Sequence, residues 1–137
     1  MPSMLHVTIQ VPASAELLEA LAEGLVQLNQ AQFELAELAG VEPPPLYESG
    51  VVYRRERGTE NWQSAAETLQ LGYGDCEDLA SWRAAELRSF DGERGARVKV
   101  IRTDRGTFHA IVEREDGSTE DPSGVLVHLE RKRKAHR

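Results

Sequence analysis

This chain has very little cysteine and no long apolar run. Its 137 residues contain one cysteine, Cys76, which excludes an internal disulfide and a metal site built from clustered cysteines. No stretch approaches the roughly 20 apolar residues that span a bilayer, and residues 1–11 lack the continuous apolar segment of a signal peptide. We therefore expect a cytoplasmic protein with no membrane partner. The single thiol is either reactive or an ordinary core residue.

The chain also lacks an excess of positive charge. Acidic residues outnumber Lys plus Arg by 23 to 16, for a formal net charge of −7. This balance argues against a general nucleic-acid or anionic-membrane binder, because both need clustered cations. The exception is the segment 131–137, which holds Arg131, Lys132, Arg133, Lys134 and Arg137. We expect a solvated, disordered basic tail there, with contact to nucleic acid or an acidic partner as the alternative.

The length fits one domain, which we assign to residues 1–130. At its start, the alternation of apolar and polar residues from Leu5 to Val11 predicts a strand. Apolar residues at helical spacing then predict helical structure from Ser14 to Ala39, as one long helix or two. We regard this strand and helix, within residues 1–40, as an extra N-terminal part, and residues 46–127 as the core.

An irregular loop follows, because Pro43–Pro45 forbid helix. The loop reaches to about Gly58, and Val51–Tyr53 within it is compatible with a short strand. Asn61 is the expected cap of a second helix, Trp62–Leu71, which Gly72 ends.

The segment Gly74–Asp78 begins a third helix, which runs to about Phe90, with Asp75 as N-cap and Asp78 completing a capping box. Three strands follow, around Val98–Val100, over Phe108–Glu113, and over Ser118–Val127 with an interruption at Pro122. Helices first and an antiparallel meander second predict an α+β fold.

Cys76 is a candidate nucleophile because it lies in the first turn of this third helix. The N-terminus of a helix favours the thiolate, which is the reactive form of a thiol. Three neighbouring carboxylates, on Asp75, Glu77 and Asp78, oppose that ionisation. Position alone therefore leaves two alternatives open, a catalytic thiol and a merely buried one.

His109 and Asp121 strengthen the catalytic alternative if the turn between them has the required form. A three-residue loop at Glu115–Gly117, with Gly117 in the left-handed region, places Ile111 opposite Asp121. Asp121 then shares the face of His109 and lies within reach of its imidazole. A two-residue turn would send Asp121 to the other face. The triad hypothesis therefore carries a prediction about the turn.

Thiol chemistry assigns the roles in such a triad. His109 accepts the thiol proton, Cys76 attacks an amide carbonyl to form a thioester, and Asp121 fixes the imidazole tautomer. The backbone N–H of Cys76 can donate to the oxyanion. The second oxyanion donor is one of three upstream side chains, in this order of preference: Gln63, Trp62 and Gln70. No ligand spacing among the histidines supports a metal-dependent enzyme, so we expect no cofactor.

Several motifs resemble those of the transglutaminase-like superfamily. Gly72–Ala80, which reads Gly-Tyr-Gly-Asp-Cys-Glu-Asp-Leu-Ala, resembles the nucleophile motif of its small bacterial and phage members. Phe108–Val112 resembles the family's histidine strand, and Glu120–Ser123 its Asp-Pro-(Ser/Thr) element. Glu60–Ser64 resembles the start of the helix before the nucleophile. The resemblance extends over Leu46–Gly124.

The resemblance implies a papain-like fold, in which the Cys76 helix packs against an antiparallel sheet that carries His109 and Asp121. It implies a cysteine hydrolase or acyltransferase acting on a peptide, isopeptide or other amide bond of a peptide or protein substrate. The tryptophan that follows the histidine in larger members is missing, so hydrolysis is the simpler expectation than protein crosslinking. The alternative is a catalytically silent binding or assembly module, for example in a phage or prophage particle.

Overall fold

The structure is a computed structural model that describes residues 5–56 and 61–136. Within these residues it combines helices with two small sheets, which confirms the α+β class. None of the helices in the described part is both long and apolar enough to cross a membrane. In chain order the elements are α1 (Ala15–Leu38), η1 (Leu46–Glu48), β1 (Val52–Tyr53), α2 (Ala65–Leu71), β2 (Tyr73–Gly74), α3 (Cys76–Phe90), β3 (Arg97–Arg102), β4 (Phe108–Glu113), β5 (Thr119–Glu120) and α4 (Pro122–Ala135).

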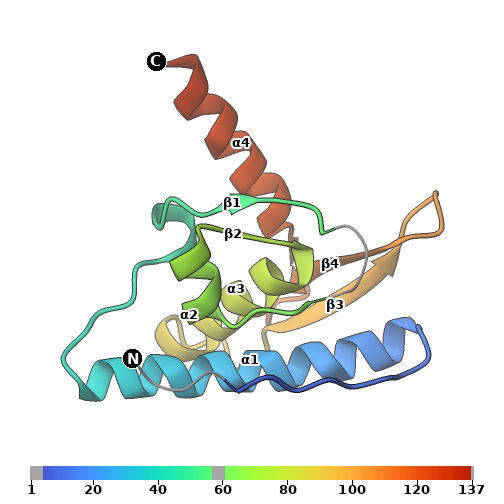
Figure 1. Cartoon of the computed structure of the whole chain (residues 1–137), viewed down its shortest axis with the longest axis horizontal. Helices are drawn as coiled ribbons and strands as arrows, with labels where there is room; N and C mark the ends of the chain where they lie inside the picture. Colours follow the sequence, from blue (N-terminus) through green and yellow to red (C-terminus); the bar gives the residue numbers. More distant parts are fainter. Residues whose placement is uncertain (1–4, 57–60, 137) are drawn as a thin grey trace.

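Helix α3 is the centre of the core (Figure 1). It packs against α1, α2, α4 and the sheet that contains β3 and β4. Leu79, Trp82 and Leu87 are each at most 1% exposed. A helix enclosed on this many sides is held by its neighbours, so its first residue, Cys76, has a fixed position relative to the strands.

Helix α1 is one continuous helix, so of the two alternatives the single long helix is confirmed. Ser14 caps it by accepting from the Leu17 backbone N–H at 3.2 Å. On its buried side, the Asn29 side chain is fully buried and accepts from the Ala65 backbone N–H at 2.8 Å. This bond ties the first turn of α2 to α1, because an N–H at a helix start has no partner within its own helix.

The larger sheet has the strand order β3-β4-β5, with antiparallel pairs throughout. The turn between β4 and β5 has the predicted three-residue form. Gly117 has φ +89°, and the Arg114 N–H donates to the Ser118 carbonyl at 2.7 Å. The register follows, with Val112 opposite Glu120, so the turn that the triad hypothesis required is confirmed.

Two expectations for the helix and strand starts are wrong. Leu5–Val11 has no strand partner, and its apolar side chains are exposed, Leu5 by 87%. Alternation alone does not make a strand, because a strand needs a neighbouring edge to satisfy its backbone. Helix α2 is capped by Ser64, whose hydroxyl accepts from the Glu67 N–H, and not by Asn61. Its predicted end at Gly72 is confirmed.

The third predicted strand is also wrong beyond Glu120. Strand β5 covers only Thr119–Glu120, and α4 begins directly after it, with Asp121 as N-cap and Pro122 in the first turn. Proline favours such a helix start, because its missing N–H would have no helical partner there. The residues of the expected disordered tail, 131–135, continue this helix, and Arg137 lies outside the described residues.

Gly74, two residues before Cys76, is closely surrounded by neighbouring side chains. A Cβ at this position would lie 3.0 Å from Thr68 Cγ2 and 3.1 Å from Asp78 Cβ. We expect Gly74→Ala to lower the free energy of unfolding by about 1–3 kcal/mol, because both neighbours are buried and cannot withdraw freely. Urea denaturation followed by circular dichroism measures the loss.

The matched control is Gly24→Ala, in α1, where a Cβ meets nothing within 4 Å. Because alanine is the better helix former, this variant should gain about 0.5–1 kcal/mol. Equal losses in the two variants would contradict the packing that we describe around Gly74.

Candidate functional site

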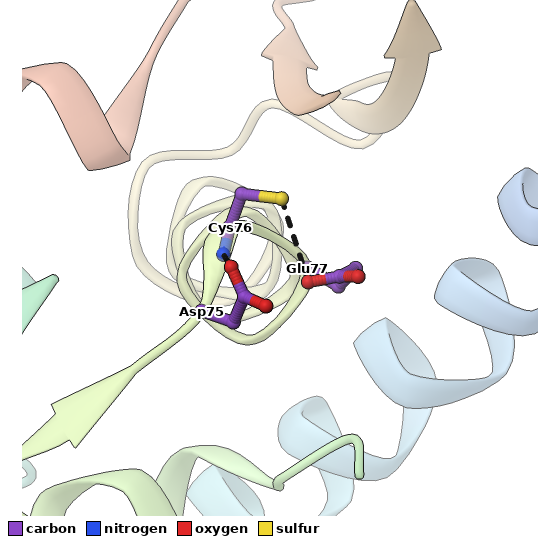
Figure 2. A group of neighbouring side chains, drawn as sticks. All are labelled: Asp75, Cys76 and Glu77. Carbon is purple, nitrogen blue, oxygen red and sulfur yellow. Dashed lines mark hydrogen bonds between the residues drawn. The ribbon is translucent and has the colours of Figure 1, made fainter. Parts of the chain in front are cut away.

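Cys76 lies at the N-terminus of α3, in the first helical turn (Figure 2). The turn is fixed by Asp75, whose Oδ1 accepts from the Cys76 backbone N–H at 2.7 Å. Asp78 completes the predicted capping box, since its Oδ2 accepts from the Asp75 N–H at 3.0 Å. The reciprocal bonds hold the backbone at Cys76 in one conformation.

His109 and Asp121 form the pair that the sequence predicted. The distance from His109 Nε2 to Asp121 Oδ1 is 3.1 Å, with side chains 25% and 48% exposed. His109 lies on β4, and Asp121 caps α4 by position only, because its side chain makes no capping bond to its own helix. Gly124 gives the carboxylate room, since a Cβ there would lie 3.2 Å from Asp121 Oδ2. The carboxylate can therefore turn toward the imidazole.

Strand β4 also reaches the thiol. The backbone of Ala110, the residue after His109, lies close enough to the Cys76 sulfur to act to lower the thiol pKa. The side-chain bond of the thiol is to Glu77, with 3.4 Å between Sγ and Oε2 (Figure 2). The structure thus brings Cys76 to the histidine strand and His109 to Asp121, while the thiol bonds to Glu77.

The local electrostatics keep the Cys76 thiol protonated. The residue is 7% exposed. Burial, followed by the negative charge of Glu77, raises the pKa of the thiol far above its ordinary value, and the Ala110 backbone offsets only part of this rise. A reactive thiolate at this position therefore needs a cation beside it, and a protonated histidine is the side chain that supplies one near neutral pH.

Two of the donors predicted for an oxyanion, the Gln63 amide and the Cys76 N–H, are engaged in other bonds. Gln63 is 6% exposed, and its Nε2 donates to Thr68 Oγ1 at 3.2 Å and to the Tyr73 carbonyl at 3.0 Å. The Cys76 N–H donates to Asp75, as described above. Trp62 is half-buried and packs against the core, and Gln70 is exposed. In this conformation Gln63 supports the capping segment rather than offering a donor.

Tyr53 is a neighbour of the site that the sequence did not single out. It pairs with Gly74 in the parallel sheet of β1 and β2. Burial, then the negative charge of Asp75, raises the pKa of its phenol, so the hydroxyl remains neutral. Only the long-range pairing of β1 with β2 places it there, and no local signal reveals that pairing.

One group of potential metal ligands exists at the same place. One ligand atom each from Asp75, Cys76 and Glu77 lie within 4.8 Å of one another (Figure 2). Their contacts are accounted for without an ion, because Asp75 caps the helix and Glu77 accepts from the thiol. We assign no metal to this group.

Comparisons of the chain with protein-family models, with curated proteins and with solved structures gave no match. The described residues hold a buried thiol at a helix start and a histidine–aspartate pair on the strand whose backbone approaches that thiol.

Proposed function

We propose that the protein is a transglutaminase-like cysteine hydrolase or acyltransferase that cleaves a peptide, isopeptide or other amide bond through a Cys76 thioester. The observation that carries the proposal is the 3.1 Å contact between His109 and Asp121, with His109 on the strand whose next residue, Ala110, approaches the thiol. Nucleophilic catalysis commonly uses a cysteine as nucleophile, a histidine as its base, and a carboxylate that orients the histidine.

The arrangement of elements supports a papain-like core. The nucleophile lies at the start of α3, and α3 packs against the sheet that carries the histidine (Figure 1). Asp121 follows β5 directly, so the acid lies at the end of the strand that pairs with the histidine strand. These are the positions expected from the resemblance of the three motifs.

The chemistry follows from the tautomer that Asp121 fixes. Because Nε2 of His109 bonds to Asp121, Nδ1 is the nitrogen that accepts the thiol proton. The sulfur then attacks the carbonyl carbon, and the imidazolium gives its proton to the departing amine as the C–N bond breaks. Water or an amine next attacks the thioester, which releases the acyl group and returns the proton to the thiol. Before the first step, the thiol must leave Glu77.

One observation favours the second candidate, a catalytically silent binding or assembly module. The thiol is buried, bonded to Glu77, and raised in pKa. A module of this kind would keep the triad as a structural relic and bind a partner without turnover.

The experiment that separates the two uses p-nitrophenyl acetate as an activated acyl donor. We expect the wild-type protein to gain one acetyl group on Cys76 by intact-mass spectrometry, and to release p-nitrophenol. Cys76→Ala should abolish the acetylation, and His109→Ala should slow it by about 10²–10⁴-fold, which is the usual contribution of a general base.

His128→Ala is the matched control, because His128 is an exposed histidine on α4. It should acetylate at the wild-type rate. Acetylation that persists in Cys76→Ala, or that slows equally in both histidine variants, would rule out the proposed nucleophile and base. The silent module would then be the better account.

A further inference from the structure

The outer half of α4 is a basic projection. Beyond Glu130 all residues through His136 are exposed, and the helix leads away from the rest of the molecule (Figure 1). Four consecutive cations, Arg131 to Lys134, occupy it. Because successive residues of a helix are about 100° apart, these side chains surround the helix instead of forming one stripe.

The inner half of the same helix is different in character. Pro122, Ser123 and Leu126 are buried, and they pack α4 against the rest of the fold. The outer half has no large apolar or aromatic side chain between Glu130 and His136. Protein–protein interfaces usually have an apolar or aromatic centre, so this surface lacks what a protein partner would normally bury.

A hollow of about 320 Å³ extends the basic surface toward β1. Arg54, Arg133 and Lys134 line it, together with one acid, Glu130. Glu130 bonds to both Arg54, at 3.2 Å, and Lys134, at 3.0 Å. Three cations against one acid leave an excess of positive charge, and among the described residues no ion pair neutralises Arg131, Lys132 or Arg133.

We propose that the outer half of α4 binds the phosphate backbone of double-stranded DNA without sequence preference. The charges are complementary, and the major groove, about 12 Å wide, admits an α-helix whose cations then face phosphates on both sides. The rest of the chain carries 23 acidic against 11 basic residues (16 less the five in 131–137). Its repulsion from the phosphates confines contact to the projecting helix.

Fluorescence anisotropy with a labelled duplex of about 20 base pairs tests the proposal. We expect binding in about 50 mM salt that weakens about 100-fold at about 200 mM, as for roughly four phosphate contacts. The triple variant Arg131→Gln, Lys132→Gln, Arg133→Gln should lose binding at least about 10-fold at low salt and lose most of the salt dependence. Circular dichroism confirms that the exposed substitutions leave the fold intact.

The control removes three exposed cations elsewhere, at Arg94, Arg102 and Arg105, each changed to Gln. It should bind as the wild type does, as should Cys76→Ala, because the proposal is independent of the thiol chemistry. No binding by the wild type would overturn the proposal, and so would equal losses in the two triple variants. Displacement of the duplex by poly-glutamate at equal charge concentration would likewise overturn it, in favour of an acidic protein partner.

Discussion

Replacing Arg83 by alanine is expected to lower the free energy of unfolding by about 3–5 kcal/mol, because it removes the nearest cation from two largely buried carboxylates. Among the described residues, Glu86 is left without an ion pair, and Glu120 keeps only the longer contact to Arg114, at 3.6 Å. Arg83 Nε donates to Glu120 Oε2 at 2.6 Å, and Nη1 lies 3.3 Å from Glu86 Oε1. Both carboxylates are less than a fifth exposed. The Tyr47 hydroxyl also donates to Glu120, at 2.6 Å, but a phenol carries no charge to balance the acid.

This loss should depend on pH. Burial acts to raise the pKa of Glu120, but the bonds from Arg83 and Tyr47 outweigh it and hold that pKa below its ordinary value. Such a group stabilises the fold above its unfolded pKa, and the contribution is lost as the pH falls through the folded one. Without Arg83 the carboxyls can be buried in protonated form, so the loss should be smaller at about pH 4 than at about pH 8. Chemical denaturation at both values measures it.

Arg97→Ala is the matched control. Arg97 is 48% exposed and pairs with Glu113 at 3.2 Å, so its removal should cost less than about 1 kcal/mol. The ion pair of Arg83 with Glu120 also links two parts of the candidate site. Glu120 immediately precedes Asp121, and Arg83 lies on the helix that begins at Cys76. Equal losses for Arg83→Ala and Arg97→Ala would contradict this account of a clamp between α3 and β5.

Asp78→Ala is expected to lower the free energy of unfolding by about 2–4 kcal/mol, because it leaves two buried N–H groups without acceptors. Asp78 is 2% exposed. Its Oδ1 accepts from the Gln63 N–H at 2.7 Å and its Oδ2 from the Asp75 N–H at 3.0 Å. The loss would combine a broken capping box with the release of the segment that contains Gln63.

The pH dependence has the opposite sign to that of Glu120. Burial raises the pKa of Asp78 to about 7, so the folded state keeps a proton that the unfolded state has released. The contribution of Asp78 to stability therefore falls as the pH rises from about 4 to about 7. Asp78→Ala should accordingly cost more at about pH 5 than at about pH 8.

Glu67→Ala is the control for the position in the helix. Glu67 lies in the first turn of α2, three residues after its cap, as Asp78 does in α3. The contact of Glu67 with the cap is made by its backbone N–H, which alanine retains. Denaturation should show a change within about 0.5 kcal/mol. A large loss in Glu67→Ala, or none in Asp78→Ala, would contradict the role of the capping box.

Local sequence signals predicted the parts of the structure that local physics controls. The cap at Asp75, the helix end at Gly72 and the turn at Gly117 each depend on residues within a few positions of one another. The pairing of His109 with Asp121 was predictable for the same reason, because a short turn fixes the register between them.

Long-range partners decided the features that the sequence could not predict. The alternation from Leu5 to Val11 had no edge to pair with. The approach of Tyr53 to the Cys76 segment and the contacts of Arg83 with Glu120 both depend on tertiary packing. The start of α4 is the exception, because Pro122 one residue after Asp121 is itself a helix-start signal, and the apparent strand pattern outweighed it.

The pH dependence of Cys76 alkylation by iodoacetamide tests the central claim most directly, because it reports on the thiol and on His109 together. We measure the wild type, His109→Ala and Glu77→Gln. In the described conformation burial and Glu77 raise the pKa of the thiol. The account predicts that the His109 imidazolium outweighs both once the thiol has left Glu77, so that the wild-type inflection lies below the free-thiol value of about 8.5. It also predicts an upward shift of at least about one pKa unit without His109, which supplies the cation, and a downward shift without the Glu77 carboxylate. An inflection at the same pH in the wild type and in both variants would contradict an activated cysteine–histidine pair.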